Sequence, residues 1–462
     1  MDSRNLIKTW LYMVCLTAAV FLVASAQARA QSNVDRTDDR LVIVTSFPPA
    51  LFDRFRTEFE KLYPELEIFI RSKKTSAAIS FIKERPTEPA DVFWASSPDA
   101  FEFLKKSGHL LQAFERTDSS VPRIGSYPLD DPDGYYRGCA ISGYGIVWNN
   151  DYLTKRNLPV PTKWEDLTNP TYKRHIGMSA PSRSGTTHLI VESILQSQGW
   201  EKGWRLLSEI GGNLATITAR SFGVIDGVRA GRFGIGISID FLGQSAKAQG
   251  APMDFLYPKG TVFLPANIGL VSRTSNRDAA MAFIDFVLST EGQTLLFEPT
   301  IRRLPVSRSV YAQAPMGYPN PFSDELARKS IQFDTNLSQQ RYHMVNSLFD
   351  VMLTYRQAAV RRTWDAVHKA ERLLEKRDLP DLVARIREAR RLMSAVPVSG
   401  AQAVDTEFVS HFARNKPGIS MPEAQVRLEA EWVRFARAHQ DQALFIARDV
   451  LTKLEVADIE QP

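Results

Sequence analysis

The sequence predicts an α/β fold, with a parallel or mixed sheet covered by helices on both faces, followed by an all-helical region. Between residues 40 and 320, short runs rich in β-branched and aromatic residues alternate with segments whose apolar residues recur at helical spacing. After about residue 320 the strand signals nearly vanish, and only helical periodicity continues. A chain of 462 residues is long enough for two or three domains, so both regions can be folded units.

The first third of the α/β region alternates strand and helix three times. The run RLVIVTSF predicts a strand, and the helix after it carries apolar residues at helical spacing from Leu51 to Leu62. ELEIFIRS and ADVFWAS predict the next two strands, with helices in SAAISFIKER and SPDAFEFLKKSGHL. Ser97 and Pro98 are typical of an N-cap and a first helical position, so they mark the start of the third helix.

The remainder of the α/β region predicts further strands with helices between them. AISGYGIVWNN and HIGMSAP predict strands, and the second leads into a helix that ends near Leu195. SFGVIDGVRAGRFGIGISIDF predicts a short helix and then a strand ending near Asp240. MDFLYPKGTVFLPANIGLVS adds strands, and NRDAAMAFIDFVLSTEGQTLLF predicts two helices separated by a brief break.

The last 140 or so residues predict at least three helices. From Leu337 to about Lys376 the apolar residues fall on one helical stripe, which predicts one long helix. A second helix is expected from Leu382 to Val396, and a third from near Ser420. The apolar stripe indicates internal packing or, alternatively, a face that binds a partner.

The N-terminus has the pattern of a cleaved signal peptide over residues 1–30. Arg4 and Lys8 precede the apolar run WLYMVCLTAAVFLVA, and the small-residue stretch SAQARA follows it. Cleavage after Ala28 and cleavage after Ala30 both fit this pattern. The alternative is an uncleaved anchor, but the apolar run is shorter than the ~20 residues that a membrane-spanning helix needs.

Charge and cysteine content favour an exported soluble protein that does not bind nucleic acid. The net charge of +5 falls to +3 when the three basic residues and one acidic residue of the predicted signal peptide are removed. No dense block of lysine and arginine stands out, so only attraction of small anions remains open. Cys139 is the one cysteine left, which excludes an intramolecular disulfide and is compatible with a bacterial periplasm.

Short hydroxyl side chains recur where the predicted strands end and the next helices begin. In an open α/β sheet, ligands bind just past the carboxyl ends of the strands, so these loops are candidate binding loops. They contain Thr45, Ser46, Lys73, Lys74, Thr75, Ser76, Ser96, Ser97, Ser182, Arg183, Ser184, Gly185, Thr186, Thr187, Arg220 and Ser221. Each serine or threonine can instead be a plain helix N-cap, but five similar loops favour a shared ligand.

The stretch SAPSRSGTTHLIVESIL has the strongest anion-binding pattern of these loops. The first N–H groups of a helix lack internal partners and carry the positive end of the helix dipole. Hydroxyl groups add neutral donors, Gly185 permits close approach to the backbone, and Arg183 can add a bidentate pair of donors. The stretch therefore predicts a site for a phosphate or a carboxylate.

Motifs for catalysis are missing from the sequence. SRSGTT has neither the G-x-S-x-G pattern of a nucleophile elbow nor the spacing of a P-loop. The seven histidines show no H-x-x-x-H or H-E-x-x-H spacing, so zinc catalysis has no support. We therefore expect a binding protein with no enzymatic activity, no cofactor and no metal. Asp240 can bind a hydroxyl or amine of the ligand or, alternatively, cap the next turn.

Four segments resemble bacterial extracellular solute-binding proteins. AMAFIDFVLSTEGQTLL resembles the helix pair near the end of these proteins, and RRLPVSRSV resembles the segment that follows it. LVIVTSFPPALFDRFRTEFEKLYP resembles their opening strand and helix, and ADVFWASSPDAF resembles their third strand and its loop. The resemblance covers roughly residues 40–315.

The resemblance implies the two-lobed, class II periplasmic-binding fold, which closes on its ligand by a hinge motion. It sets boundaries for three parts: lobe 1 at residues 40–145 and 265–320, lobe 2 at 146–264, and an all-helical tail at 321–462. The hinge strands are expected near Ser142–Ile146 and Phe263–Gly269.

The resemblance also implies a function and two alternatives. A monomer in the periplasm would bind a small anionic ligand, such as a phosphoglycerate-like metabolite, for an inner-membrane ABC permease. The first alternative is a ligand-sensing protein that signals to a membrane sensor kinase. The second is ferric-ion binding, for which related proteins place adjacent tyrosines in the segment corresponding to SIDFLG. Here that segment has Asp240 and Phe241, and Tyr135 and Tyr136 come too early, which favours an organic anion.

The expected ligand-binding residues come from both lobes and from the hinge. They are Thr45, Ser46, Thr75, Ser76, Ser96, Ser97, Tyr144, Ser182, Arg183, Ser184, Gly185, Thr186, Ser221, Phe222 and Asp240.

Overall fold

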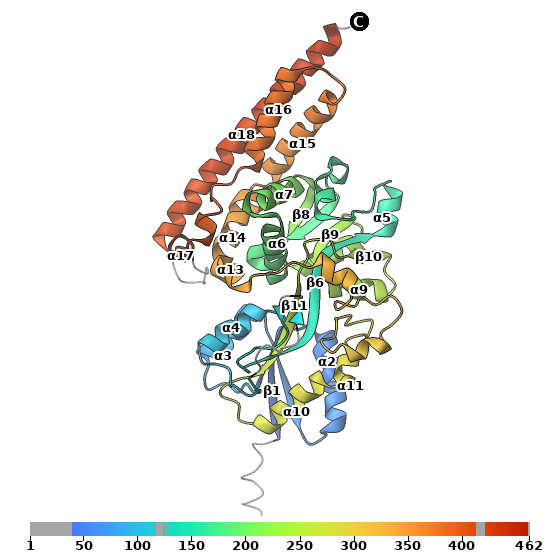
Figure 1. Cartoon of the computed structure of the whole chain (residues 1–462), viewed down its shortest axis with the longest axis vertical. Helices are drawn as coiled ribbons and strands as arrows, with labels where there is room; N and C mark the ends of the chain where they lie inside the picture. The colour runs from blue at the N-terminus through green and yellow to red at the C-terminus, as the bar shows by residue number, and fades with distance from the viewer. Residues whose placement is uncertain (1–38, 117–122, 126, 413–420, 461–462) are drawn as a thin grey trace, which may run out of the picture.

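The computed structural model describes residues 39–116, 123–125, 127–412 and 421–460. The predicted signal peptide and both of its cleavage sites lie outside the described residues. None of the described helices is long and apolar enough to cross a membrane. In Figure 1 the chain forms two α/β parts, one above the other, with a helical arm that extends from the upper one to the C-terminus.

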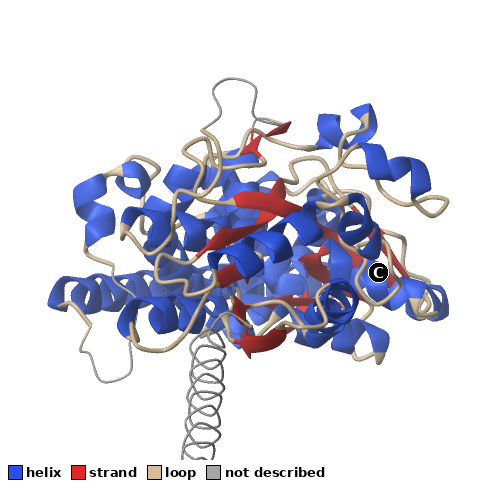
Figure 2. Ribbon diagram, turned by 90° about the horizontal axis from the view of Figure 1, so that it is seen from below, coloured by secondary structure: helices blue, strands red, loops and turns tan. Residues whose placement is uncertain are grey.

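One mixed sheet runs through both α/β parts, with the strand order β2-β1-β3-β11-β6-β9-β7-β8 and with β10 paired to β6. Figure 2 shows helices on both faces of this sheet, as the alternating sequence pattern predicts. The strands are β1 (Arg40–Thr45), β2 (Glu67–Ser72), β3 (Val92–Ala95), β6 (Arg137–Asn149), β7 (Ile176–Ser179), β8 (Leu214–Thr218), β9 (Ile235–Ile239), β10 (Met253–Leu256) and β11 (Phe263–Leu270). A separate hairpin is formed by β4 (Arg123–Ile124) and β5 (Tyr127–Pro128).

Lobe 1 contains the parallel strands β2, β1 and β3 with helices packed on both faces. Its helices are α2 (Pro49–Leu62), α3 (Thr75–Glu84), α4 (Pro98–Lys106), α10 (Arg277–Leu288) and α11 (Thr290–Leu295), with a 3-10 turn at Ser309–Gln313. Ser97 and Pro98 hold the predicted N-cap and first positions of α4. Phe55 and Phe59 of α2 are fully buried on one face of the sheet, and Phe101 of α4 on the other.

Lobe 2 contains β9, β7, β8 and the second half of β6. Its helices are α5 (Asn150–Lys155), α6 (Gly185–Gln198), α7 (Trp200–Asn213), α8 (Ser221–Arg229) and α9 (Asp240–Ala248), with 3-10 turns at Trp164–Thr168, Pro170–Tyr172 and Pro181–Arg183. The sequence pattern does not predict α7 or the short strand β8 that follows it.

The long strands β6 and β11 connect the lobes. They pair antiparallel from Arg137 with Ile268 to Gly143 with Phe263. From Tyr144 onward β6 pairs with β9 of lobe 2 instead. The pairing partner therefore changes inside the expected hinge segment, although the lobe boundaries themselves stay a prediction.

The tail is all-helical, as predicted. Its elements are α12 (Asp324–Lys329), α13 (Thr335–Gln340), α14 (Tyr342–Phe349), a π-helix (Asp350–Thr354), α15 (Gln357–Leu374), α16 (Pro380–Ser394), a 3-10 turn (Gln402–Val404), α17 (Thr406–Ser410) and α18 (Glu423–Glu460). The prediction of one helix from Leu337 to Lys376 is wrong, because this stretch is divided into α13, α14, the π-helix and α15. No glycine or proline marks the divisions, and the segments pack against different helices of lobe 2 and of the tail.

The apolar stripe of the tail is buried against lobe 2. Val345 and Leu348 of α14 and Trp364 of α15 are fully buried in the same hydrophobic cluster as Trp204 and Ile210 of α7. Lobe 1 has separate clusters on the two faces of its sheet. The tail and lobe 2 therefore share one core, whereas lobe 1 has cores of its own.

Candidate functional site

The carboxyl ends of the strands in both lobes point toward the hinge. In lobe 1 the last residue of β3, Ala95, pairs with Asn267 of β11, a few residues from the hinge end of that strand at Phe263. In lobe 2 the last residue of β9, Ile239, pairs with Tyr144, the first residue of β6 beyond the lobe 1 pairing. The loops after these strands therefore meet at the lobe junction, where an α/β sheet binds its ligand.

Arg303 is the charged side chain at the centre of this junction. It is only 2% exposed. Its Cζ lies 4.6 Å from the ring centroid of Phe47, after β1 in lobe 1, and 3.9 Å from that of Phe241, after β9 in lobe 2. Nη1 donates to Ser142 Oγ at 3.3 Å, and Nε is buried without a partner. The aromatic contacts hold the guanidinium in place and leave hydrogen-bond donors unused.

Asp240 lies beside Arg303 and ties lobe 2 to the hinge. Its Oδ2 accepts from the backbone N–H of Gly143 at 2.7 Å and from the hydroxyl of Tyr257 at 3.0 Å, and Oδ1 accepts from the N–H of Phe241 at 2.7 Å. Burial raises the pKa of Asp240 to about 7, although these hydrogen bonds and the charge of Arg303 lower it. Asp240 therefore caps its own turn, and its role as a ligand-binding residue stays a prediction.

Tyr144 connects the two sides of the junction electrostatically. Burial is the main cause that raises the pKa of its phenol, and the nearby carboxylates of Asp240 and Asp99 act in the same direction. Arg303 lowers the same pKa. The Tyr144 hydroxyl therefore lies near charged groups of both lobes, and its role as a ligand-binding residue stays a prediction.

Two further polar side chains at the lobe 1 edge are buried without partners. Asn267 is fully buried in β11, and neither Oδ1 nor Nδ2 has a hydrogen bond. Ser46 Oγ, next to Phe47, is also buried and unpartnered. Buried polar groups are normally paired, so unpaired ones at the lobe junction indicate groups that a bound ligand or water satisfies.

The predicted lobe 1 residues follow the strand ends as expected. Thr45 is the last residue of β1, fully buried, and its Oγ1 accepts from the N–H of Phe47 at 3.1 Å. Ser96 and Ser97 follow β3 and are partly exposed, and Ser97 makes no side-chain cap hydrogen bond. Thr75 and Ser76 begin α3 at the end of the edge strand β2, farther from the hinge in the strand order.

The loop at residues 182–186 contains one side chain that caps a helix and several residues that are exposed to solvent. Ser184 is the N-cap of α6, and its Oγ accepts from the N–H of Thr187 at 3.3 Å. Ser182, Arg183 and Gly185 are exposed, and Thr186 is partly exposed. Burial raises the pKa of Tyr355 in the tail, and Arg183 lowers it, which places the Arg183 guanidinium close to the tail. The role of Arg183 as the charge partner of an anion stays a prediction.

Ser221 and Phe222 begin α8 after the edge strand β8 of lobe 2. Ser221 is buried, whereas the Phe222 ring is 47% exposed. An exposed ring at the start of a helix is available to cover a ligand, and this role of Phe222 stays a prediction.

Sequence reasoning missed Arg303, Asn267 and the aromatic rings that hold the arginine. The available signals were a polar amide inside the apolar strand FLPANIGL and an arginine directly before the LPV segment. Among the described residues, no group of three or more histidine, cysteine, aspartate or glutamate side chains is placed to hold a metal ion.

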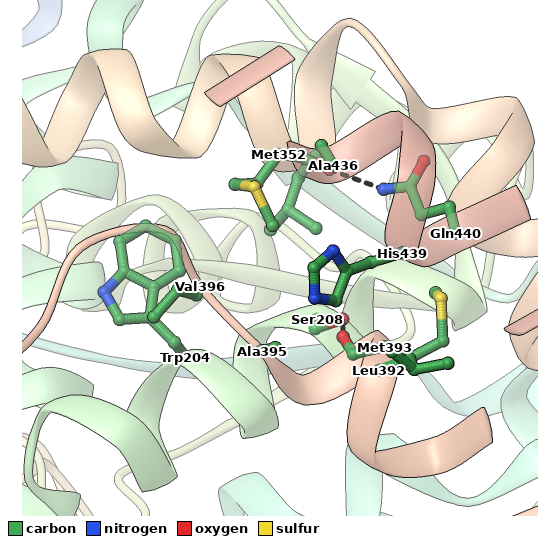
Figure 3. A pocket seen from close by; sticks show the side chains of 11 residues that line it. Trp204, Ser208, Met352, Leu392, Met393, Ala395, Val396, Ala436, His439 and Gln440 are labelled. Atoms are coloured by element: carbon green, nitrogen blue, oxygen red, sulfur yellow. Dashed lines mark hydrogen bonds between the residues drawn. The ribbon is translucent and has the colours of Figure 1, made fainter. Parts of the chain in front are cut away.

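Two hollows lie elsewhere, where lobe 2 meets the tail. One has a volume of about 10 Å³, between Trp204 and Ser208 of α7 and His439 and Gln440 of α18. Figure 3 shows these side chains around it, with Gln440 donating to the backbone oxygen of Met352 at 3.4 Å. This volume is about what one water needs, so the hollow is a packing defect of the shared core and no ligand site.

The second hollow is an open groove of about 690 Å³ between the loop after α16 and helices α17 and α18. Its lining includes Phe408, Leu428 and Trp432, with Glu201 and Glu431 among its charged residues. Both charged side chains are acidic, so this groove does not have the chemistry of an anion site.

Comparison with known proteins identifies the family. A model of the bacterial extracellular solute-binding proteins matches residues 87–323. The chain is 31% identical over 383 residues to the phosphoglycerate transport regulatory protein PgtC of Salmonella typhimurium, an alignment that covers 80% of this chain and 89% of that protein. The protein therefore belongs to the bacterial extracellular solute-binding protein family.

Solved structures agree on the fold. The periplasmic binding protein AfuA of Actinobacillus pleuropneumoniae, solved with fructose-6-phosphate bound, superposes with a TM-score of 0.55 at 22% identity, covering 67% of this chain and 98% of that chain. The apo ferric ion-binding protein A of Pasteurella haemolytica superposes with a TM-score of 0.52 at 17% identity, covering 68% of this chain and 97% of that chain. The two-lobed periplasmic-binding fold is thus confirmed, with the tail as an extension beyond it.

Proposed function

We propose that the protein captures a small organic anion, of the phosphoglycerate type, between its lobes in the periplasm and delivers it to an inner-membrane ABC permease. The observation that carries this proposal is Arg303, a buried guanidinium between the lobes with unused donors. The guanidinium group of arginine is planar and carries several hydrogen-bond donors, so it suits the oxygens of phosphates and carboxylates. The printed name of the Salmonella relative refers to phosphoglycerate transport, which supports the same class of ligand.

The chemistry of the site supports binding without turnover. No nucleophile–base pair is formed near the junction by the side chains that the structure describes. Arg303, Asn267, Ser46 and Tyr144 offer mainly hydrogen-bond donors to a ligand. Donors with one cation match an oxyanion better than a ferric ion, which needs anionic oxygen ligands.

Isothermal titration tests the ligand and the role of Arg303 together. Wild-type protein is titrated with 3-phosphoglycerate, 2-phosphoglycerate, phosphoenolpyruvate, fructose 6-phosphate and ferric citrate. We expect a phosphorylated carboxylate to bind, and Arg303→Met to weaken it by at least 30-fold, since losing one partner of a buried charge pair costs about 2–5 kcal/mol. Arg183→Ala, on the exposed loop, is the matched arginine variant, and the larger loss of affinity identifies which of the two arginines is the charge partner of the anion.

Two results would contradict this proposal in different ways. Loss of binding in Arg183→Ala with normal binding in Arg303→Met would move the anion site to the loop at residues 182–186. If the wild-type protein binds only ferric citrate, or none of the five compounds, the proposed ligand class is wrong. Arg303→Lys keeps the charge and loses the planar donors, so intermediate affinity would identify the hydrogen-bond geometry as the important property.

The second candidate function is ligand sensing for a membrane sensor kinase. It is favoured by the tail, which extends well beyond the fold shared with solved binding proteins, and by the word "regulatory" in the relative's name. Because the tail shares its core with lobe 2, deleting it would expose that core and unfold the protein. A surface substitution is the better test: Phe445→Ser on α18, where the ring is 69% exposed, should abolish induction of the transporter while ligand binding persists.

A further inference from the structure

Helix α13 and the start of α14 are fixed to α6 of lobe 2 by buried polar pairs. Arg341 donates from Nε and Nη2 to the two carboxylate oxygens of Glu192 at 2.9 and 2.8 Å, and Glu192 is completely buried. His188 is hydrogen-bonded through Nδ1 to Asn346 Oδ1 at 2.8 Å and through Nε2 to Ser338 Oγ at 3.2 Å. Breaking a buried ion pair costs several kcal/mol, so this segment moves with lobe 2.

The same short helix also contacts lobe 1. Gln339 Nε2 of α13 donates to Asp99 Oδ1 at 3.0 Å, and Asp99 lies in the first turn of α4. Thr335, the first residue of α13, lies close to the phenol of Tyr127 in β5. Both lobe 1 partners come before the hinge in the chain, whereas the partners of Arg341 come after it. Helix α13 therefore bridges the lobes.

The lobes approach each other closely at this bridge. Burial is the main cause that raises the pKa of Asp99, and the charges of His188 and Glu192 on α6 also act on it. These charges act on Asp99 because α4 and α6, from different lobes, lie near each other at this bridge. A rotation of the lobes about β6 and β11 must separate Asp99 from α6, and α13 has to leave one of its two partners.

We infer that α13, Thr335–Gln340, is a latch that restrains opening of the lobes and so sets the rate at which ligand exchanges. The latch contacts on lobe 1 break first. The hydrogen bond between Gln339 and Asp99 is replaced by hydrogen bonds to water when the lobes part, so its net contribution to stability is small. Glu192 and Arg341 are charged and remain buried together. The lobe contact itself does not depend on the ligand, but the effect on exchange rests on the proposed binding function.

The latch also connects the lobes to the rest of the tail. Gln340, next to the latch residue Gln339, donates from Nε2 to the backbone oxygen of Val404 at 3.1 Å and to Thr406 Oγ1 at 3.2 Å. These partners belong to the tail. One helix of six residues thus contacts lobe 1, lobe 2 and the distal tail, and Gln340→Ala is a matched control that spares the lobe 1 contact.

Distance measurements between the lobes test the latch without any ligand. Spin labels are attached at Thr87→Cys in lobe 1 and Thr154→Cys in lobe 2, both exposed, and the native Cys139 is buried. We expect Gln339→Ala to raise the ratio of open to closed molecules about fivefold, the effect of losing one hydrogen bond of ordinary strength. Gln340→Ala should leave the distance distribution unchanged, and Asp99→Ala combined with Gln339→Ala should shift it no further than one of them alone.

Ligand release is then measured by stopped flow with 3-phosphoglycerate as the probe. Release should accelerate by about the same factor in Gln339→Ala, because the lobes must part before the ligand leaves. If the distance distribution of Gln339→Ala equals that of Gln340→Ala, the latch is refuted, whatever the protein binds. If the distribution shifts but 3-phosphoglycerate does not bind, the latch stands and the proposed ligand is wrong.

Discussion

The tail meets the two lobes in two different ways. Against lobe 2 it buries whole helix faces and pairs charges inside the contact, with Glu209 of α7 bonded to His368 of α15 at 2.9 Å and to Arg390 of α16 at 2.8 Å. Against lobe 1 the tail makes smaller contacts: Gln339 of α13 donates to Asp99 at 3.0 Å, and Leu326 of α12 is buried with Ile124 and Leu129. The contact with lobe 2 is the more extensive of the two, so we expect the tail and lobe 2 to move together relative to lobe 1.

The largest expected effect comes from breaking the contact between the tail and lobe 2. Arg341→Met leaves the Glu192 carboxylate buried without its partner, so we expect the free energy of unfolding to fall by about 3–5 kcal/mol. Urea unfolding followed by circular dichroism measures the change.

Arg391→Met is the control for this prediction. Its partner Glu388 lies on the surface of the same tail, and the exposed pair should contribute nothing measurable. Equal stability of the two variants would mean that charge pairing does not hold the tail on lobe 2. Replacing both Glu192 and Arg341 by methionine should recover part of the loss, since no unpaired charge remains.

The next effect concerns the hinge, where a buried carboxylate joins the lobes without help from the tail. The pKa of Asp240 is raised to about 7 in the folded protein from an ordinary value near 3.8, so the folded state binds the proton more tightly than the unfolded state. The stabilisation is present at low pH and is lost as the pH rises toward and through 7. Stability should therefore fall by about 2–3 kcal/mol between pH 5 and pH 8.

Asp240→Asn should flatten this pH dependence, measured as unfolding free energy at several pH values. Asp254→Asn is the comparison variant, because the pKa of Asp254 is lowered and its titration lies below this range. A slope that persists in Asp240→Asn would assign the pH dependence to another group and leave the hinge insensitive to pH.

A smaller effect tests the packing between α7 of lobe 2 and α15 of the tail. A Cβ on Gly212 of α7 would lie 2.6 Å from Trp364 Cβ of α15, whereas one on Gly211 would lie 3.2 Å from the end of the flexible Leu353 side chain. Gly212→Ala should lower the thermal midpoint in line with about 1–3 kcal/mol of overpacking. Gly211→Ala should cost less, because Leu353 can adjust. If both variants are equally stable, the two helices are not in the close contact described.

Much of the fold follows from local pattern. The strands and helices from β1 to α4 and from α10 to α11 appear where apolar spacing and caps such as Ser97 and Pro98 place them. The divisions of the tail helices do not follow from local pattern. Arg341 lies between α13 and α14, and its side chain reaches Glu192, a partner 149 positions away. Strand β8 is short and has few strongly apolar residues, so only pairing with β7 defines it.

The candidate site, like the fold, can be predicted from the sequence only in part. The positions of the hydroxyl-rich loops after β1, β2, β3, β7 and β8 could be predicted, because strand ends in an α/β sheet face a common edge. Arg303 could not, because its environment is made by Phe47 and Phe241, which are far from it and from each other in the sequence. The loop at 182–186 looked the strongest by composition, yet Ser184 caps its own helix and Arg183 lies near Tyr355 of the tail.

Helix α18 gives the body formed by lobe 2 and the tail an unusual reach. Its 38 residues, at 1.5 Å per residue, span about 57 Å, and Figure 1 shows it running outward from lobe 2 to the C-terminus. It acts as a lever whose fulcrum is the hinge. A rotation of about 15°, of the size seen when rigid bodies turn about an interface, would displace its far end by roughly 15 Å relative to its near end. A small rotation between the lobes would thereby become a displacement of about the width of a helix at the C-terminal end of α18.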